Sequence, residues 1–150
     1  HCVLYFTGLQ RIASSIESRK IIGINKKRNL EKLKIISSIT DEALNEFSKK
    51  NFSVKKIGSL LHDQWEEKKK LTNGISNYKV DKIYDLAKKL GVYGGKLLGA
   101  GGGGFFLFIC NSKVKKKLKK KLKSQNFVDF KFEFTGSQII YNGNYSDYNI

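Results

Sequence analysis

The chain has no proline, no methionine and only two cysteines among its 150 residues. Cys2 and Cys110 are too few for a disulfide framework, and their spacing matches no zinc or redox motif. We therefore expect reduced thiols, a cytoplasmic setting, and Cys110 as a small buried hydrophobic residue at a strand end. The absence of methionine and the start at His1 favour a piece of a longer protein or a processed product.

Long apolar runs are also missing. The longest apolar stretch, residues 97–110, is too short and too rich in glycine to cross a bilayer. The run at residues 3–6 is too short for a secretory signal and has no basic region before it. No two carboxylates are spaced for metal binding. We therefore expect neither a membrane segment nor a metal site that this chain forms alone.

Acidic residues are scarce beside basic ones, with 13 against 29 and a net charge of +16. Many of the lysines lie in residues 113–123, and such a cluster raises the possibility of nucleic-acid binding. However, Val114, Leu118 and Leu122 recur there at helical spacing, which makes the lysines the solvated face of an amphipathic helix. Base-contacting arginines and an aromatic stacking platform are missing. We therefore expect no nucleic-acid partner.

The apolar patterns predict a single α+β domain, with an antiparallel sheet of about four strands and helices packed on one face. Strands are expected at residues 3–6, 105–110, 128–134 and 138–141. Helices are expected after residue 11, behind N-caps at Thr40, Ser53 and Asn77, and over residues 113–123, with a stop signal at Gly91. The polar tail, residues 142–150, is expected to fray.

A glycine-rich stretch at residues 94–104 directly precedes the apolar strand 105–110. Ordering consecutive glycines costs backbone entropy, so the chain needs positive φ angles or a close approach there. Gly99, Gly101 and Gly104 have dinucleotide-motif spacing, but a predicted helix before the loop and a strand after it are the wrong context. No Walker A sequence is present. Two interpretations remain, an anion-binding concavity of backbone amides and a tight connection without a ligand.

The residues of this stretch resemble the third, C-terminal motif of the GHMP small-molecule kinases, which include galactose, homoserine and mevalonate kinases. Other segments resemble the heptose 7-phosphate kinase branch. These segments are Tyr5 to Gly8 with Arg11 and Ala13, Leu61 to Trp65 with Lys68 and Lys69, Gly74 to Asn77 with Asp81, and Phe132 to Ser137. The resemblance covers nearly the whole chain. It implies a ferredoxin-like C-terminal domain that spans residues 1–150.

The resemblance implies transfer of the γ-phosphoryl group of ATP to a sugar, most closely to the anomeric hydroxyl of a heptose 7-phosphate. The expected nucleotide and substrate loop consists of Gly99, Ala100, Gly101, Gly102, Gly103 and Gly104. Arg11, Lys68 and Lys69 are the expected substrate-binding residues. The family's Pro-x-x-x-Gly-Leu-Gly-Ser-Ser-Ala motif and its catalytic residues belong to an N-terminal half that is absent from this sequence. We therefore expect that half as a partner, Mg²⁺ held mainly by it, and an isolated chain without activity.

Simpler interpretations stand beside these. Arg11, Lys68 and Lys69 also fit solvated basic positions, Trp65 fits a core anchor, and His62 fits a packing partner better than a catalyst. A domain that kept the kinase fold as a binding module, and a GHMP sugar kinase with another substrate, are the alternative functions. The sequence leaves homo-oligomerisation open.

Overall fold

The computed structural model describes residues 1–10 and 27–141. Its elements in chain order are β1 (Cys2–Phe6), α2 (Lys27–Phe47), α3 (Val54–Lys69), α4 (Tyr78–Leu90), β2 (Gly94–Leu97), β3 (Phe105–Ile109), α5 (Ser112–Lys121) and β4 (Phe127–Val128), with a short 3-10 turn at Ser124–Asn126. The predictions for Arg11, for the start of the helix after it, and for the tail from residue 142 lie outside the described residues.

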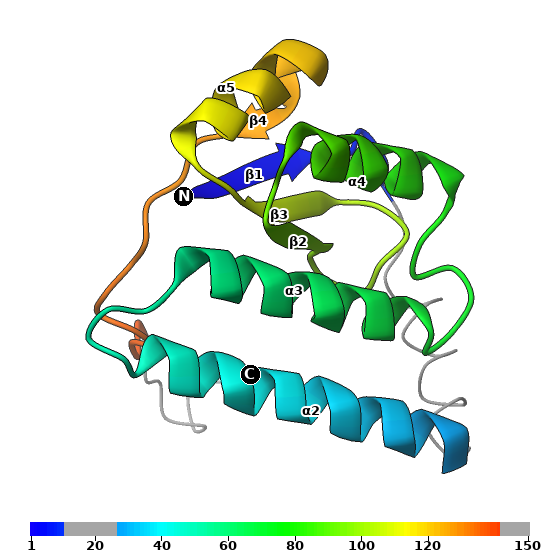
Figure 1. Ribbon diagram of the computed structural model, residues 1–150, viewed down its shortest axis with the longest axis vertical. Helices are drawn as coiled ribbons and strands as arrows, with labels where there is room; N and C mark the ends of the chain where they lie inside the picture. The colour runs from blue at the N-terminus through cyan, green and yellow to red at the C-terminus, as the bar shows by residue number, and fades with distance from the viewer. Residues whose placement is uncertain (11–26, 142–150) are drawn as a thin grey trace, which may run out of the picture.

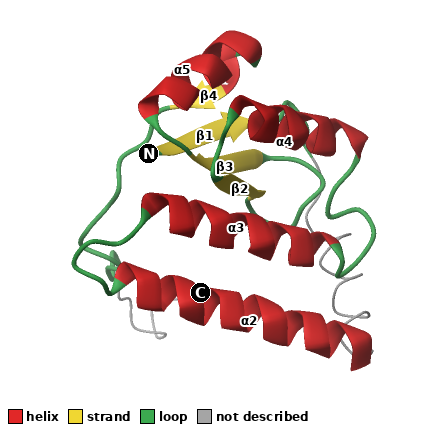
Figure 2. Ribbon diagram, in the orientation of Figure 1, coloured by secondary structure: helices red, strands yellow, loops and turns green. Residues whose placement is uncertain are grey.

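The four strands form one antiparallel sheet in the order β2-β3-β1-β4. Figure 1 shows α3, α4 and α5 grouped around this sheet, with α2 lying along the far side of α3. Figure 2 shows the same helical layer against the strands. This architecture confirms the predicted α+β fold class.

The core lies between the sheet and its helices. Val3 and Tyr5 of β1 stand beside Phe108 and Phe106 of β3 in register, and all four side chains are buried on the same sheet face. Trp65 of α3 meets Phe106 edge to face at 6.0 Å, and Tyr84 of α4 lies 5.6 Å from Phe106. The remaining buried side chains include Ile75, Val80, Leu97, Val114 and Leu118. Burying these aromatic and aliphatic groups is the main stabilising contribution to such a fold.

Two predicted helix caps are confirmed. The Ser53 side chain accepts a hydrogen bond from the Lys56 amide at the start of α3, and the Asn77 side chain accepts from the amides of Lys79 and Val80 at the start of α4. Gly91 ends α4 in the left-handed conformation, with φ of 101°. The lysine-rich helix is α5, and its buried residues are Val114 and Leu118, as the apolar spacing predicts.

The predicted N-cap at Thr40 is wrong, because α2 runs through this residue without a break. The Thr40 hydroxyl donates to the carbonyl of Ile36 at 2.9 Å, four residues earlier in the same helix. A threonine satisfied in this way no longer needs to cap a new helix.

Strand β2 was not expected, since the whole stretch from residue 94 was predicted as a loop after a helix. Glycine is depleted in strands, but α3 lies so close to β2 that a larger residue does not fit. A Cβ at Gly94 would lie 1.9 Å from the carbonyl oxygen of Gly58 on α3. The glycine stretch is therefore partly an edge strand, and only its second part is a loop.

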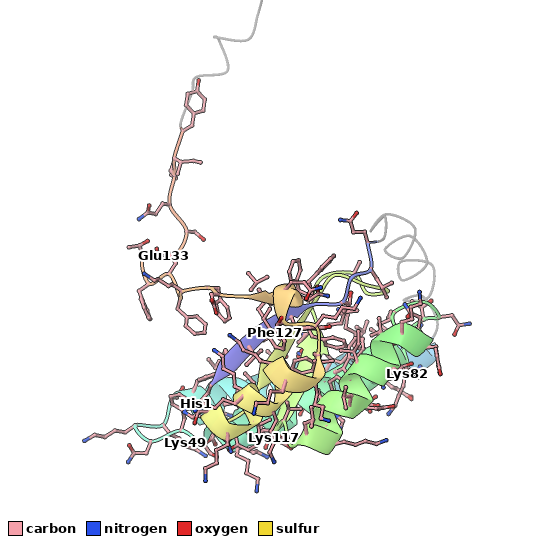
Figure 3. All side chains as sticks on the ribbon, turned by 90° about the horizontal axis from the view of Figure 1, so that it is seen from above. His1, Lys49, Lys82, Lys117, Phe127 and Glu133 are labelled. Atoms are coloured by element: carbon pink, nitrogen blue, oxygen red, sulfur yellow. The ribbon has the colours of Figure 1, made fainter. Side chains whose placement is uncertain are left out.

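The predicted strand at residues 128–134 is confirmed only at Val128, and the predicted strand at residues 138–141 is wrong. Only Phe127 and Val128 pair with β1, and residues 129–141 form no regular structure. Figure 3 shows this segment leaving the body beyond Phe127, with Glu133 along it. Phe134 is 92% exposed, so the alternating pattern has no neighbouring strand or core to pack against.

No helix in the described ranges is both long and apolar enough to cross a membrane. Over the same residues, the structure holds no cluster of three or more histidine, cysteine or acidic side chains that would bind a metal ion.

Candidate functional site

The candidate site is built around the glycine loop, residues 99–104, which joins β2 to β3 as the turn of a hairpin. The Leu98 amide donates to the Phe105 carbonyl at 2.8 Å and closes the hairpin below the loop. The loop thus follows a strand, which corrects the predicted helix-to-strand context. It still opens into a strand, so a dinucleotide-binding turn remains excluded.

Glycine is required in this loop for two physical reasons. At Gly101 the backbone has φ of 116°, and an added Cβ would lie 2.8 Å from both the Cα and the carbonyl oxygen of Ile75. At Gly103 an added Cβ would lie 2.6 Å from the carbonyl oxygen of Leu9. The first position therefore needs the left-handed region and a close approach, and the second needs the close approach.

Hydrogen bonds from three directions hold the loop. The Gly102 amide donates to the Ile75 carbonyl at 2.8 Å, and the Asn77 side-chain amide donates to the Gly102 carbonyl at 2.9 Å. The Thr7 amide and hydroxyl each donate to the Gly104 carbonyl at 2.9 Å. Because β1 and the start of α4 both anchor it, the loop is preorganised rather than shaped by a ligand.

Gly101 and Gly103 line a pocket, and their amides make no hydrogen bond within the described residues. The amides of Gly102 and Gly104, in contrast, are already paired. This pocket of about 400 Å³ lies between the loop and the side chains of Phe6, Leu9 and Phe105. Backbone amides beside a largely apolar hollow can bind an anionic group and the less polar part of the same ligand.

The two predicted lysines lie at different distances from the loop. The Lys68 ammonium group donates to the Gly99 carbonyl at 2.6 Å, so this side chain borders the loop. The Lys69 ammonium group pairs with Glu66 at 2.8 Å and lies 5.8 Å from the centre of the Trp65 ring. The structure therefore brings Lys68 to the candidate site and holds Lys69 on the surface of α3. The third predicted residue, Arg11, is outside the described ranges.

Of the residues before these lysines, Trp65 packs in the core, whereas His62 packs against Tyr84 and stays partly exposed. Trp65 is completely buried, and its indole N–H has no hydrogen-bond partner within the described residues. His62 Nδ1 lies 2.8 Å from the hydroxyl of Tyr84, and the two rings stack. Burial lowers the pKa of His62, and the nearby Lys88 lowers it further. Burial likewise raises the pKa of Tyr84. His62 thus has the contacts of a packing partner.

Sequence reasoning missed three residues of the site. Asn77 is predicted as a helix cap and as part of a matching segment, but not as a residue that holds the loop through a second hydrogen bond. Thr7 was noted only as part of a matching segment. Lys96 on β2 was overlooked because it stands inside a stretch predicted to be loop. Its ammonium group donates to the side-chain oxygen of Gln64 on α3.

The chain is similar to kinases of known activity. It is 34% identical over 136 residues to the D-glycero-alpha-D-manno-heptose 7-phosphate kinase of Campylobacter jejuni, a match that covers 89% of this chain and 40% of that protein. It is also 30% identical over 136 residues to the bifunctional fucokinase/GDP-fucose pyrophosphorylase of Arabidopsis thaliana, covering 86% of this chain and 12% of that protein. The chain therefore spans well under half the length of these relatives.

The fold is similar to that of solved kinases as well. The crystal structure of the Methanococcus jannaschii mevalonate kinase superposes with a TM-score of 0.65 at 28% sequence identity, covering 85% of this chain and 37% of that one. The family model for the GHMP kinases C terminal matches residues 42–129, which include α3, the glycine loop and β3. By fold, loop and family match, the chain belongs to the GHMP kinases and carries their C-terminal region.

Proposed function

We propose that this chain is the C-terminal part of an ATP-dependent sugar kinase, in which the glycine loop forms one wall of the phosphoryl-transfer site. The observation that carries this proposal is the anchored loop, in which Gly101 and Gly103 line a pocket and their amides have no hydrogen-bond partner among the described residues. Phosphoryl transfer depends on positioning and on stabilising negative charge, and preorganised amides supply both.

The loop residues Gly99, Ala100, Gly101, Gly102, Gly103 and Gly104 are proposed to contact the nucleotide phosphates or the acceptor. Lys68 is proposed as a cation at the edge of this loop, where its charge would meet an anionic group. Lys69 and Arg11 remain predictions as substrate-binding residues. The present position of Lys69, paired with Glu66, gives it less access to the loop than Lys68 has.

The acceptor is proposed to be D-glycero-D-manno-heptose 7-phosphate, phosphorylated at its anomeric hydroxyl. Support comes from the Campylobacter jejuni relative, which is similar over most of this chain. The fucokinase and mevalonate kinase relatives define the alternatives, since their names give other acceptors. Because the chain is similar to all of these kinases, an experiment has to determine which acceptor it uses.

Bound ATP would supply the transferred phosphoryl group, and Mg²⁺ would shield its charge. The unused loop amides fit a phosphate group, whereas the described residues offer no cluster of three metal ligands. We infer that any Mg²⁺ is held chiefly by ATP and by an N-terminal half of the kind that the longer relatives carry. A cytoplasmic setting stays a prediction.

The test is a coupled assay of ADP release with the protein expressed from its complete gene. Heptose 7-phosphate, L-fucose and mevalonate serve as parallel acceptors. We expect the highest kcat/KM with heptose 7-phosphate and little release with mevalonate. Preference for fucose or mevalonate would reassign the acceptor. Absence of ADP release with every acceptor would instead support a binding module without kinase activity.

A further inference from the structure

Lys96 is a partly buried cation for which the described chain supplies no counter-charge. It lies on β2 opposite Leu107, and its ammonium group donates to the neutral side-chain oxygen of Gln64. No ion pair joins Lys96 to a carboxylate within residues 1–10 and 27–141. Burial in this position lowers the pKa of Lys96. Burying an unpaired cation costs desolvation free energy, which the binding of an anion offsets.

Other lysines of the same region differ from Lys96 in this respect. Lys56 of α3 pairs with Glu42 at 2.6 Å, and Lys70, just after α3, pairs with Glu67 at 2.5 Å. These pairs are at the surface, where water also solvates the ammonium groups. The chain thus provides carboxylates for exposed lysines and leaves the more buried Lys96 with an amide.

Lys96 and Lys68 both lie along the line of contact between α3 and the segment formed by β2 and the glycine loop, which we call the seam. Helix α3 runs beside β2, and the contacts proceed in order along both elements, from Gly58 against Gly94 to Gln64 against Lys96 and Lys68 against Gly99. Gln64 and Lys68 are four residues apart, so they occupy the same helix face about 6 Å apart along the axis. The seam therefore carries two ammonium groups, and it ends at the glycine loop.

We propose that Lys96, together with Lys68, binds the phosphate group of a phosphorylated sugar acceptor. The inference rests on the proposed function, and it accounts for a preference for a sugar phosphate over a neutral sugar. A phosphate monoester carries nearly two negative charges at neutral pH and presents several acceptor oxygens, which suits two ammonium groups along the same line of contact between α3 and β2. Nucleotide phosphates have the same chemistry, so the test includes a nucleotide.

The experiment titrates the protein expressed from its complete gene, without ATP, at pH 7.5 and constant ionic strength with heptose 7-phosphate, with the corresponding sugar without phosphate, and with ADP. Binding is followed by the shift of the thermal unfolding midpoint. We expect saturable binding of the sugar phosphate and none of the neutral sugar. Lys96→Gln should weaken sugar-phosphate binding at least fivefold. Lys117→Gln, which makes the same charge change on exposed α5 (Figure 3), should bind like the parent.

A second variant separates binding from folding. Gln64→Glu places a carboxylate beside Lys96, so it should stabilise the protein against urea while weakening sugar-phosphate binding at least fivefold. A purely structural role for Lys96 predicts no loss of binding in this variant. Unchanged binding in both variants, no saturable binding by the parent, or loss of ADP binding alone would overturn the proposal. Because binding is measured without turnover, a kinase assay that fails for other reasons gives a different pattern.

Discussion

At the scale of single residues, the glycine loop shows why this sequence keeps costly glycines. Gly101 and Gly103 lie against the backbone of Ile75 and Leu9, where no side chain fits. The amides of both glycines make no hydrogen bond within the described residues. The requirement for glycine and the capacity to bind an anion therefore arise from one backbone arrangement.

Replacement of Gly101 by alanine should destabilise the protein strongly. The new Cβ would lie 2.8 Å from the backbone of Ile75 at a φ of 116°, and such strain costs about 2 to 3 kcal/mol. Gly99→Ala is the matched control, since its φ of 75° is also positive but no atom lies within 4 Å of the new Cβ. That variant should lose about 1 kcal/mol. Urea unfolding measures both, and equal losses would contradict the close contact with Ile75.

His62 should make stability depend on pH. Its pKa is lowered in the folded protein, mainly by burial and then by Lys88, against the smaller raising effects of Glu66 and Asp63. The unfolded chain therefore binds a proton first as pH falls through about 6.5, and stability declines below that pH. The free energy of unfolding should be lower at pH 5.5 than at pH 7.5.

His62→Asn is the control for this pH effect. An asparagine side chain can still hydrogen-bond to Tyr84 but does not titrate. The decline between pH 7.5 and 5.5 should therefore shrink in the variant. The lowered pKa values of Glu46 and Glu133 act at more acidic pH, so they do not interfere. Identical pH profiles for the parent and the variant would show that His62 is not the group responsible.

At the scale of elements, Asn77 couples helix α4 to the glycine loop. Its side-chain oxygen caps the helix, and its side-chain nitrogen holds the Gly102 carbonyl. Asn77→Asp keeps the cap acceptor and loses the donor, so α4 should persist while the Gly102 amide exchanges its hydrogen faster. Asn77→Ala loses both bonds and should cost about 2 kcal/mol in urea unfolding. Protection of Gly102 in Asn77→Asp equal to that of the parent would contradict this coupling.

Helix ends that depend on a single capping residue could be predicted from the sequence. Ser53, Asn77 and Gly91 mark real helix ends because their side chains or φ angles satisfy the terminal groups. Strand β2 could not be predicted, because its glycines are required by tertiary contacts, Gly94 against Gly58 of α3 and Gly95 against Leu107 and Phe108 of β3. Residues 129–141 alternate like a strand, yet alternation cannot supply the neighbour that a strand needs.

Some parts of the candidate site could likewise be predicted from the sequence, and others could not. The glycine loop is visible in the sequence because glycine itself carries the requirement, and Lys68 was found through the family resemblance. The anchoring roles of Thr7 and Asn77, and the pairing of Lys96 with Gln64, depend on tertiary contacts between residues 25 to 97 positions apart. No local pattern encodes such contacts.

At the scale of the whole molecule, the chain matches one region of longer kinases. It covers 40% of the Campylobacter jejuni relative and 37% of the Methanococcus jannaschii structure. The family match and the sheet topology establish which region this is. In the proposed function, the glycine loop is one wall of a site, and the opposite wall comes from an N-terminal half.

The most direct measurement follows the γ-phosphate of labelled ATP in the protein expressed from its complete gene, beside a folded Gly103→Ala variant. The account predicts that label moves to heptose 7-phosphate and that the variant, with a Cβ forced against Leu9, transfers it at least tenfold more slowly. Transfer by Gly103→Ala at the parental rate, or no transfer from ATP to any sugar or sugar phosphate, would contradict it.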